Sequence, residues 1–203
     1  ENYSEAIADL NKTIELVPDS DELHFDRGRL RYMIKDYNGA IEDFSKTIGI
    51  NINFPSAHVN RARSKNKLKD YVGAIEDLNI AIEYNDKPYQ GMYSFRADLK
   101  KESGDIEGAL EDINISLSID PNIDFNYMYR GEVKYILEDY KGAISDFTKA
   151  IELQDEPSAF YYNQRAVAKR ESGDPKGAIV DYNKALSIDP NYTSSIGGRG
   201  TAK

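Results

Sequence analysis

Histidine is the side chain best suited to proton transfer near neutral pH, and the chain contains only two, His24 and His58. An active site needs several different residue types that meet at one place, such as a nucleophile, a base and a group that orients the base. These two histidines instead occupy the same position in successive copies of one repeated sequence unit. We therefore expect both to be packing residues.

Adjacent carboxylates can serve as a general acid and a general base, and the chain has such pairs at Glu42-Asp43, Glu76-Asp77 and Glu111-Asp112. A catalytic pair should occur once, whereas these pairs recur at a nearly constant interval. Each aspartate also follows an arginine at a constant interval, so an ion pair between two helices explains both residues. We predict five structural ion pairs: Arg27 with Asp43, Arg61 with Asp77, Arg96 with Asp112, Arg130 with Asp146, and Arg165 with Asp181.

The overall composition excludes several other kinds of site. There are no cysteines, which excludes disulfides, thiolate metal sites and cysteine nucleophiles, and we expect neither a metal nor a cofactor. The formal net charge of −9 repels phosphate backbones, so we do not expect nucleic acid as a partner. No window is apolar over the roughly 18 residues that a membrane span needs, and the N-terminus lacks a secretory pattern. We expect a cytoplasmic protein; a signal could have been removed, because the first residue is Glu.

The recurrences come from one sequence unit that is copied along the chain. A phrase of Gly or Glu, then Ala, then Ile or Leu has its alanine at residues 6, 40, 74, 109, 143 and 178, which are 34, 34, 35, 34 and 35 residues apart. A period of about 34 residues is typical of a helix-turn-helix unit. A second phrase, Arg followed by Gly or Ala, keeps the same register at Arg27-Gly28, Arg61-Ala62, Arg96-Ala97, Arg130-Gly131, Arg165-Ala166 and Arg199-Gly200.

Both phrases resemble the tetratricopeptide repeat (TPR) family, in a variant that reads Arg-Gly/Ala and then Gly-Ala-Ile-x-Asp. The resemblance covers essentially the whole chain. It implies an all-α fold, namely a right-handed superhelical α-solenoid of antiparallel helix-turn-helix hairpins in a single array. The expected parts are the second helix of an incomplete repeat over 1–20, complete repeats over 21–54, 55–89, 90–123, 124–158 and 159–192, and the first helix of an incomplete repeat over 193–203.

Two turns indicate short links between antiparallel helices. Ser103-Gly104-Asp105 and Ser172-Gly173-Asp174 place Gly at the end of one helix and Asp at the N-cap of the next, and Pro175 follows at a first helical position. The chain departs from the family at two positions of the first helix. His or Tyr replaces the usual Trp, and Arg replaces the usual Leu.

The resemblance also implies a binding face for a protein or peptide ligand. In this family the concave surface is lined by the first helix of each repeat. These positions are polar and locally basic in the first half of the chain, and richer in aromatic and apolar residues in the second half. Burial against adjacent repeats is the alternative explanation of the apolar ones. The expected partner-binding residues are Phe25, Arg29, Tyr32, Asn60, Arg63, Lys67, Phe95, Phe125, Met128, Tyr129, Tyr135, Phe160 and Gln164.

We therefore predict a non-catalytic scaffold for protein–protein interactions that binds a peptide or helical segment of a partner in a concave groove. The alternative is that these repeats are the accessory region of a larger enzyme, secretion or assembly component whose active part lies outside this sequence. The chain lacks the Lys and Asn set with which some relatives bind the C-terminal carboxylates of chaperones. We also expect the incomplete terminal repeats to allow head-to-tail self-association, with truncation as the alternative explanation of these ends.

Overall fold

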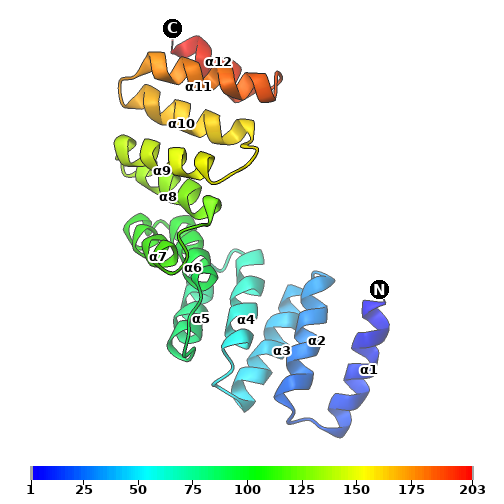
Figure 1. Cartoon of the computed structure of the whole chain (residues 1–203). Helices are drawn as coiled ribbons and strands as arrows, with labels where there is room; N and C mark the ends of the chain where they lie inside the picture. Colours follow the sequence, from blue (N-terminus) through cyan, green and yellow to red (C-terminus); the bar gives the residue numbers. More distant parts are fainter. Residues whose placement is uncertain (1, 203) are drawn as a thin grey trace. The chain divides into compact units, whose positions relative to one another are not determined.

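The fold is built from α-helices. The computed structural model describes residues 2–202, and these residues form twelve helices and no strand (Figure 1). The all-α class and the tetratricopeptide hairpin architecture that the sequence predicts are confirmed. The helices are α1 (Tyr3–Leu16), α2 (Asp21–Met33), α3 (Tyr37–Ile50), α4 (Pro55–Lys67), α5 (Tyr71–Glu83), α6 (Gln90–Ser103), α7 (Ile106–Ile119), α8 (Asp124–Ile136), α9 (Tyr140–Glu152), α10 (Ala159–Glu171), α11 (Pro175–Ile188) and α12 (Thr193–Thr201).

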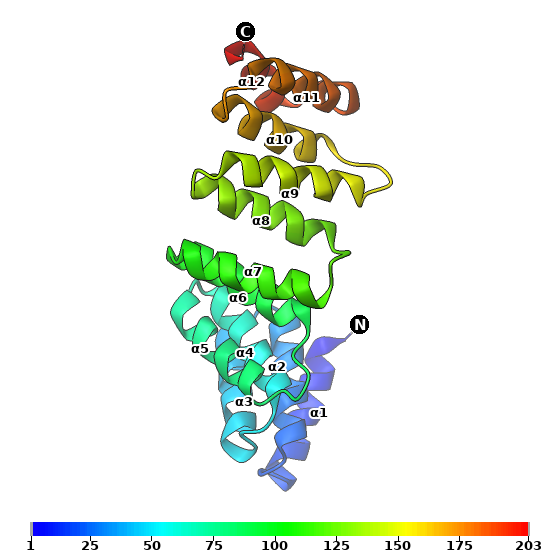
Figure 2. The ribbon, with the colours of Figure 1, turned by 60° about the vertical axis from the view of Figure 1, so that its left-hand side comes forward.

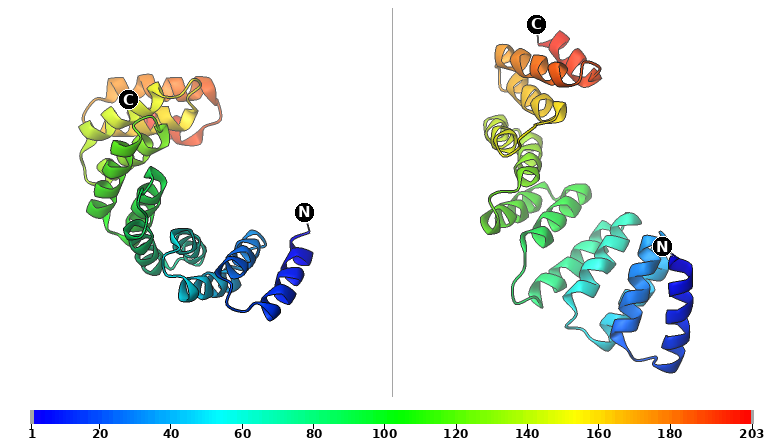
Figure 3. Two further views of the ribbon diagram at one scale, coloured as in Figure 1. Left: turned by 60° about the horizontal axis from the view of Figure 1, so that its bottom comes forward. Right: turned by 45° about the vertical axis from the view of Figure 1, so that its right-hand side comes forward.

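The helices form two compact units, which comprise residues 1–103 and 104–203. In the first unit α2 pairs with α3 and α4 pairs with α5 as helical hairpins, while α1 packs on α2 and α6 packs on α5. In the second unit α8 pairs with α9 and α10 pairs with α11, while α7 packs on α8 and α12 packs on α11. Figure 2 shows α8 to α11 stacked in chain order, and the right-hand view of Figure 3 shows α1 to α5, blue to cyan-green, side by side.

Several helices begin in the same way, with an aspartate cap and a glycine. In α3 the side chain of Asp36 accepts a hydrogen bond from the backbone N–H of Gly39 at 3.0 Å. A Cβ atom at Gly39 would overlap the Asp36 carboxylate, so glycine at this position allows the cap to form. The glycine of the repeated Gly-Ala-Ile phrase thus supplies the backbone N–H that the capping aspartate binds. The same pair begins α5, α7, α9 and α11, at Asp70 and Gly73, Asp105 and Gly108, Asp139 and Gly142, and Asp174 and Gly177.

Left-handed residues form the tight turns between helices. Gly104 and Gly173 precede α7 and α11 with φ of 92° and 86°, which confirms the two glycine turns predicted from the sequence. Lys35, Lys69 and Glu138 adopt the same conformation in three other turns, with φ of 66°, 64° and 62°. A residue with a Cβ costs roughly 1–2 kcal/mol in this conformation. These three turns are therefore less favourable locally than the glycine turns.

The core of each hairpin combines a small residue on its first helix with a large residue on its second. Gly28 of α2 lies against the ring of Phe44 in α3, and Gly131 of α8 lies against the ring of Phe147 in α9. A Cβ atom at Gly131 would come within 2.5 Å of Cε1 of Phe147. The small residue that follows each repeated arginine therefore permits the close approach of two helices.

Candidate partner-binding site

Buried ion pairs join the two helices of each hairpin. The Asp77 carboxylate in α5 is almost fully buried and accepts hydrogen bonds from Arg61 of α4, from Nη2 at 2.5 Å and from Nε at 3.0 Å. Lys65 Nζ, also on α4, lies 2.9 Å from Oδ2 of the same carboxylate. One aspartate is therefore paired with two cations of the facing helix. The same arrangement joins Asp43 to Arg27 and Arg31, Asp146 to Arg130 and Lys134, and Asp181 to Arg165 and Lys169.

These contacts keep the buried carboxylate charged. Burial raises the pKa of Asp77, but the contacts of its carboxylate with His58, Arg61 and Lys65 outweigh burial and lower the pKa from its ordinary value of 3.8 to about 2. Asp77 is therefore ionised at neutral pH and is unsuited to proton transfer. The second cation is not predicted from the sequence, although a basic residue recurs one helical turn after each repeated arginine. That recurrence is the signal that identifies it.

Each of these arginines also contacts the helix that precedes its hairpin. Arg27 Nη1 donates a hydrogen bond to Asn11 Oδ1 of α1 at 2.7 Å, in addition to its bonds with Asp43 of α3. The guanidinium thus joins three consecutive helices. Equivalent contacts run from Arg61 to Ser45, from Arg130 to Asn114 and from Arg165 to Thr148.

The two histidines pack against the ion pairs of the first unit. His24 Nε2 lies 2.9 Å from the carbonyl oxygen of Pro18, and its Nδ1 lies 3.7 Å from Oδ1 of Asp43. His58 makes the same two kinds of contact, with a backbone carbonyl at 3.2 Å and with Asp77 at 3.8 Å. Both rings are buried. This placement agrees with a packing role.

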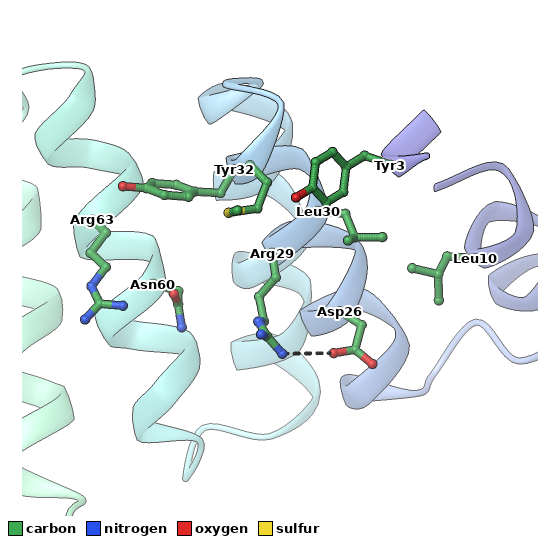
Figure 4. A pocket seen from close by; sticks show the side chains of 9 residues that line it. Tyr3, Leu10, Asp26, Arg29, Leu30, Tyr32, Asn60 and Arg63 are labelled. Carbon is green, nitrogen blue, oxygen red and sulfur yellow. Dashed lines mark ion pairs between the residues drawn. The ribbon is translucent and has the colours of Figure 1, made fainter. Parts of the chain in front are cut away.

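One face of the first unit holds an open cavity of about 620 Å³ between α1, α2 and α4 (Figure 4). Four predicted partner-binding residues line it: Arg29 and Tyr32 of α2, and Asn60 and Arg63 of α4. Arg29 Nη1 lies 3.8 Å from Oδ1 of Asp26 in an exposed ion pair. Arg63 is exposed and has no hydrogen-bond or ion-pair partner among residues 2–202. The structure thus brings polar and basic side chains of two successive first helices together.

Apolar side chains from α1 and α2 form the rest of this cavity. Tyr3 and Leu10 line it from α1, and Figure 4 shows the Tyr3 ring beside Leu30 and Leu10 between Leu30 and α1. Met33 of α2 is 59% exposed and also lines it. Tyr3 and Leu10 are not predicted from the repeat pattern, because that pattern assigns ligand contacts to first helices only. Their spacing of two helical turns, which places both on one side of α1, is the signal that identifies them.

The second unit has a smaller cavity, of about 260 Å³, between α8 and α10. Two predicted residues, Tyr135 and Gln164, line it together with Ile136 and Val167. Ile136 is 50% exposed, so apolar surface is accessible there. Glu132 supplies a charged group to a lining that is otherwise apolar or neutral. This cavity therefore suits an apolar side chain.

Residues 49–197, most of the chain, match the family model of the ETO1 C-terminal domain. The chain belongs to the ETO1 C-terminal domain family. No curated protein sequence matches this family member.

Solved structures of tetratricopeptide proteins share the fold of this ETO1 C-terminal domain chain. One is YrrB, described as a TPR protein with an unusual peptide-binding site, which has a TM-score of 0.83 and 14% identity over 94% of this chain and 97% of YrrB. Another is MamA, with a TM-score of 0.79 and 17% identity over 85% of this chain and 93% of MamA. A chain of the Cut9–Hcn1 hetero-tetramer of the APC/C has a TM-score of 0.68 and 18% identity over 98% of this chain but 39% of its own length. At such identities these similarities establish the fold.

Several of the predicted partner-binding residues lie outside the two cavities. Phe25 packs its ring against that of Phe44, with centroids 5.7 Å apart, and Phe95 packs against the core of the first unit. Both are half-buried. Lys67, Phe125 and Phe160 are exposed but line neither cavity.

Met128 and Tyr129 are buried, which favours the alternative of packing against neighbouring helices over contact with a partner. Met128 is 2% exposed and Tyr129 is 4% exposed. Met128 packs with Ala143 and Phe147 of α9, because its position on α8 faces the interior of the hairpin. The exposed aromatic residue of this helix is Phe125, one turn earlier, at 62%.

The remaining observations concern membrane spans, metal sites and the fifth predicted ion pair. Within the part that the structure describes, no helix has the length and apolar character needed to cross a membrane. Residues 2–202 also contain no group of three or more His, Asp or Glu side chains suited to holding a metal ion. Arg96 and Asp112 belong to different units, so their pairing stays a prediction.

Proposed function

We propose that this chain is a non-catalytic scaffold that binds peptide or helical segments of partner proteins on the first helices of its hairpins. The observation that carries the proposal is that each unit has a cavity lined mainly by first-helix side chains, including Arg29 and Asn60 in one unit and Tyr135 and Gln164 in the other. Open cavities with a few polar groups on an apolar lining are the usual form of a binding site.

The distribution of reactive groups supports a role without catalysis. The buried carboxylates, such as Asp77 and Asp146, are each neutralised by two cations and recur from hairpin to hairpin. His24 and His58 recur in the same way and contact those carboxylates. An enzyme needs a group that differs from its neighbours in environment and access. The repeated groups instead serve to fix helix positions.

The two cavities suit different parts of a partner. The cavity of the first unit has cationic side chains at Arg29 and Arg63, whereas that of the second unit has accessible apolar side chains at Ile136 and Val167. Apolar and aromatic contacts supply most of the affinity of such interfaces. Charged contacts contribute specificity and faster association. A scaffold with one cationic cavity and one apolar cavity can therefore discriminate between partner segments by their charge and by their apolar side chains.

Two structurally similar proteins make peptide binding a reasonable first test. The YrrB structure is described as having a peptide-binding site, and the Cut9–Hcn1 structure is a hetero-tetramer. These are properties of those proteins. Their relation to this chain is a shared fold.

Selection from a library of displayed random peptides tests the proposal. We expect the immobilised chain to select peptides, whose affinities are then measured by fluorescence anisotropy. Met33→Ala combined with Ile136→Ala removes exposed apolar surface from both cavities, and should weaken binding about 10-fold. The matched control is Val72→Ala with Val180→Ala, which removes similarly exposed side chains from the second helices α5 and α11. Failure to select any peptide, or equal losses in both double variants, would refute groove binding.

A further inference from the structure

We infer that the cavity of the first unit binds an acidic peptide segment, which places carboxylates on Arg29 and Arg63 and an apolar side chain between α1 and α2. The inference rests on the proposed function, and it names the chemistry of the partner at one of the two cavities. The observation that supports it is that the guanidinium groups of Arg29 and Arg63 are not paired with a buried carboxylate among residues 2–202.

The arginines of the first two hairpins fall into two classes. Arg27, Arg31 and Arg61 each place a guanidinium nitrogen within 3.0 Å of a buried aspartate. Arg29 is different: its side chain is 62% exposed, and its ion pair with Asp26 is 3.8 Å long and exposed. Arg63 is also exposed and has no ion pair among the described residues. Both cavity arginines are thus available to a ligand, since exposed ion pairs contribute little.

Asn60 adds a group that suits an extended backbone. Its amide Nδ2 donates a hydrogen bond to the backbone oxygen of Ser56 at 2.7 Å, which holds the side chain in place. Its carbonyl oxygen accepts no hydrogen bond within residues 2–202, and Figure 4 shows Asn60 on the same helix as Arg63 and facing the cavity. This oxygen can accept a backbone N–H of a peptide. A guanidinium binds a carboxylate through two parallel hydrogen bonds, which a lone chloride or a neutral side chain cannot provide.

The apolar part of the cavity indicates a second requirement. Its volume of about 620 Å³ is lined on one side by Tyr3, Leu10 and Leu30 and extends to Met33, which is 59% exposed. Covering such surface stabilises a complex roughly in proportion to the apolar area removed from water. We therefore expect an aromatic or branched aliphatic residue close to the acidic residues of the bound segment.

The charge of the whole chain favours a peptide over a nucleic acid. The formal net charge is −9, and Asp26 lies on the same cavity beside Arg29. A nucleic acid strand carries a charge at every phosphate and would meet this negative field beyond the cavity. A peptide segment can place one or two carboxylates on the two arginines and remain neutral elsewhere.

Charge-reversal variants test the inference on peptides selected from the displayed library. Among the selected sequences we expect enrichment of Asp and Glu next to an apolar residue. Arg29→Glu with Arg63→Glu should weaken binding of such a peptide by about 100-fold, since each charge-assisted contact is worth roughly 10-fold or more. The matched control is Lys12→Glu with Lys46→Glu, which reverses two exposed charges away from the cavity and should change the affinity by about 2-fold or less. Circular dichroism checks that all variants remain folded.

Reversing the charges of both the cavity and the peptide distinguishes direct contact between them from a general change in the electrostatic field of the chain. The Arg29→Glu, Arg63→Glu variant should bind copies of the same peptide in which Asp and Glu are replaced by Lys, and it should bind them better than the original chain does. A control peptide with Asn and Gln at these positions should bind both chains about equally. The Lys12→Glu, Lys46→Glu variant should show no such preference.

The outcomes distinguish this inference from the proposed function. Selected peptides without acidic enrichment, or an acidic peptide whose affinity is the same in the charge-reversed variant, would overturn the inference and leave the scaffold function intact. A library that yields no binder overturns both. Displacement of the peptide by a single-stranded oligonucleotide of comparable affinity would assign the cavity to nucleic acid and overturn the carboxylate assignment.

Discussion

Replacing Asp77 with alanine should destabilise the first unit strongly, because the change leaves two cations without a counter-charge. The side chains of Arg61 and Lys65 are only 18% and 19% exposed, and both donate to this carboxylate. Removing one partner from a buried ion pair costs about 3–5 kcal/mol. Because the two cations keep some contact with water, we expect the lower end of this range, about 3 kcal/mol.

Acid should weaken the same interaction, because the pKa of Asp77 is lower in the folded chain than its ordinary value. Its folded-state pKa of about 2 lies below the ordinary value of 3.8. Its contribution to stability is therefore complete above the ordinary value and is lost as the pH falls from 3.8 toward 2. At about 1.4 kcal/mol per pKa unit, the carboxylate contributes up to about 2 kcal/mol that acid removes. The Asp77→Ala variant should lose less stability over that interval.

Urea unfolding followed by far-ultraviolet circular dichroism measures both effects. Glu76→Ala is the matched control, because Glu76 is the exposed neighbour of Asp77 on α5 and carries the same charge. A loss of about 3 kcal/mol corresponds to a fall in the melting temperature of about 6–12 °C for a chain of this size. Hydrogen exchange should show reduced protection in α4 and α5. A free energy of unfolding for Asp77→Ala within about 0.5 kcal/mol of that for Glu76→Ala would refute the reasoning.

Three other perturbations have outcomes that the structure determines. Gly131→Ala should destabilise the second unit by about 1–3 kcal/mol, because the new methyl group would meet the ring of Phe147 in α9. Gly49→Ala, at an open position of α3, should instead stabilise the chain by up to about 1 kcal/mol. Equal effects of the two substitutions in thermal unfolding would contradict this contrast. Met128→Ala should cost about 2–5 kcal/mol in urea unfolding and Phe125→Ala less than about 1 kcal/mol, and the reverse order would show that the burial is assigned wrongly. Burial and a hydrogen bond to a carboxylate raise the pKa of Tyr161 to about 12, so the second unit should lose stability as the pH rises from 10 toward 12. Tyr161→Phe should remove that loss, and unchanged alkaline unfolding in the variant would count against it.

The repeat pattern predicts the hairpins because packing demands recur with each helix pair. A small residue must face a large one, as Gly131 faces Phe147, and an aspartate must meet the arginine of the facing helix. Both demands appear in the sequence as constant intervals. The second cation, such as Lys134 beside Asp146, follows from the same logic but requires the three-dimensional geometry to be recognised.

The candidate site is less predictable, because a repeat position specifies the side of a helix and not the depth of a side chain. Met128 lies on a helix whose preceding turn reaches solvent at Phe125, yet its side chain fills the hairpin interior. Tyr3 and Leu10 line the larger cavity from α1, which the family pattern does not count as a ligand-binding helix. Arg63 is predicted as a ligand contact from its position on a first helix, and its side chain lines the cavity. The family pattern therefore indicates the ligand-facing side of a helix but not which of its side chains are accessible.

Chemical-shift mapping of the ¹⁵N-labelled chain with a library-selected peptide tests most directly whether the first helices bind a partner segment. The largest changes should lie on α2 and α4 around Asn60, on α8 and α10 around Gln164, or on both, according to which cavity the peptide occupies. The Met33→Ala, Ile136→Ala variant should show smaller changes at the same peptide concentration. Changes confined to the second helices α3, α5, α9 and α11, with none on a first helix, would contradict the proposed function.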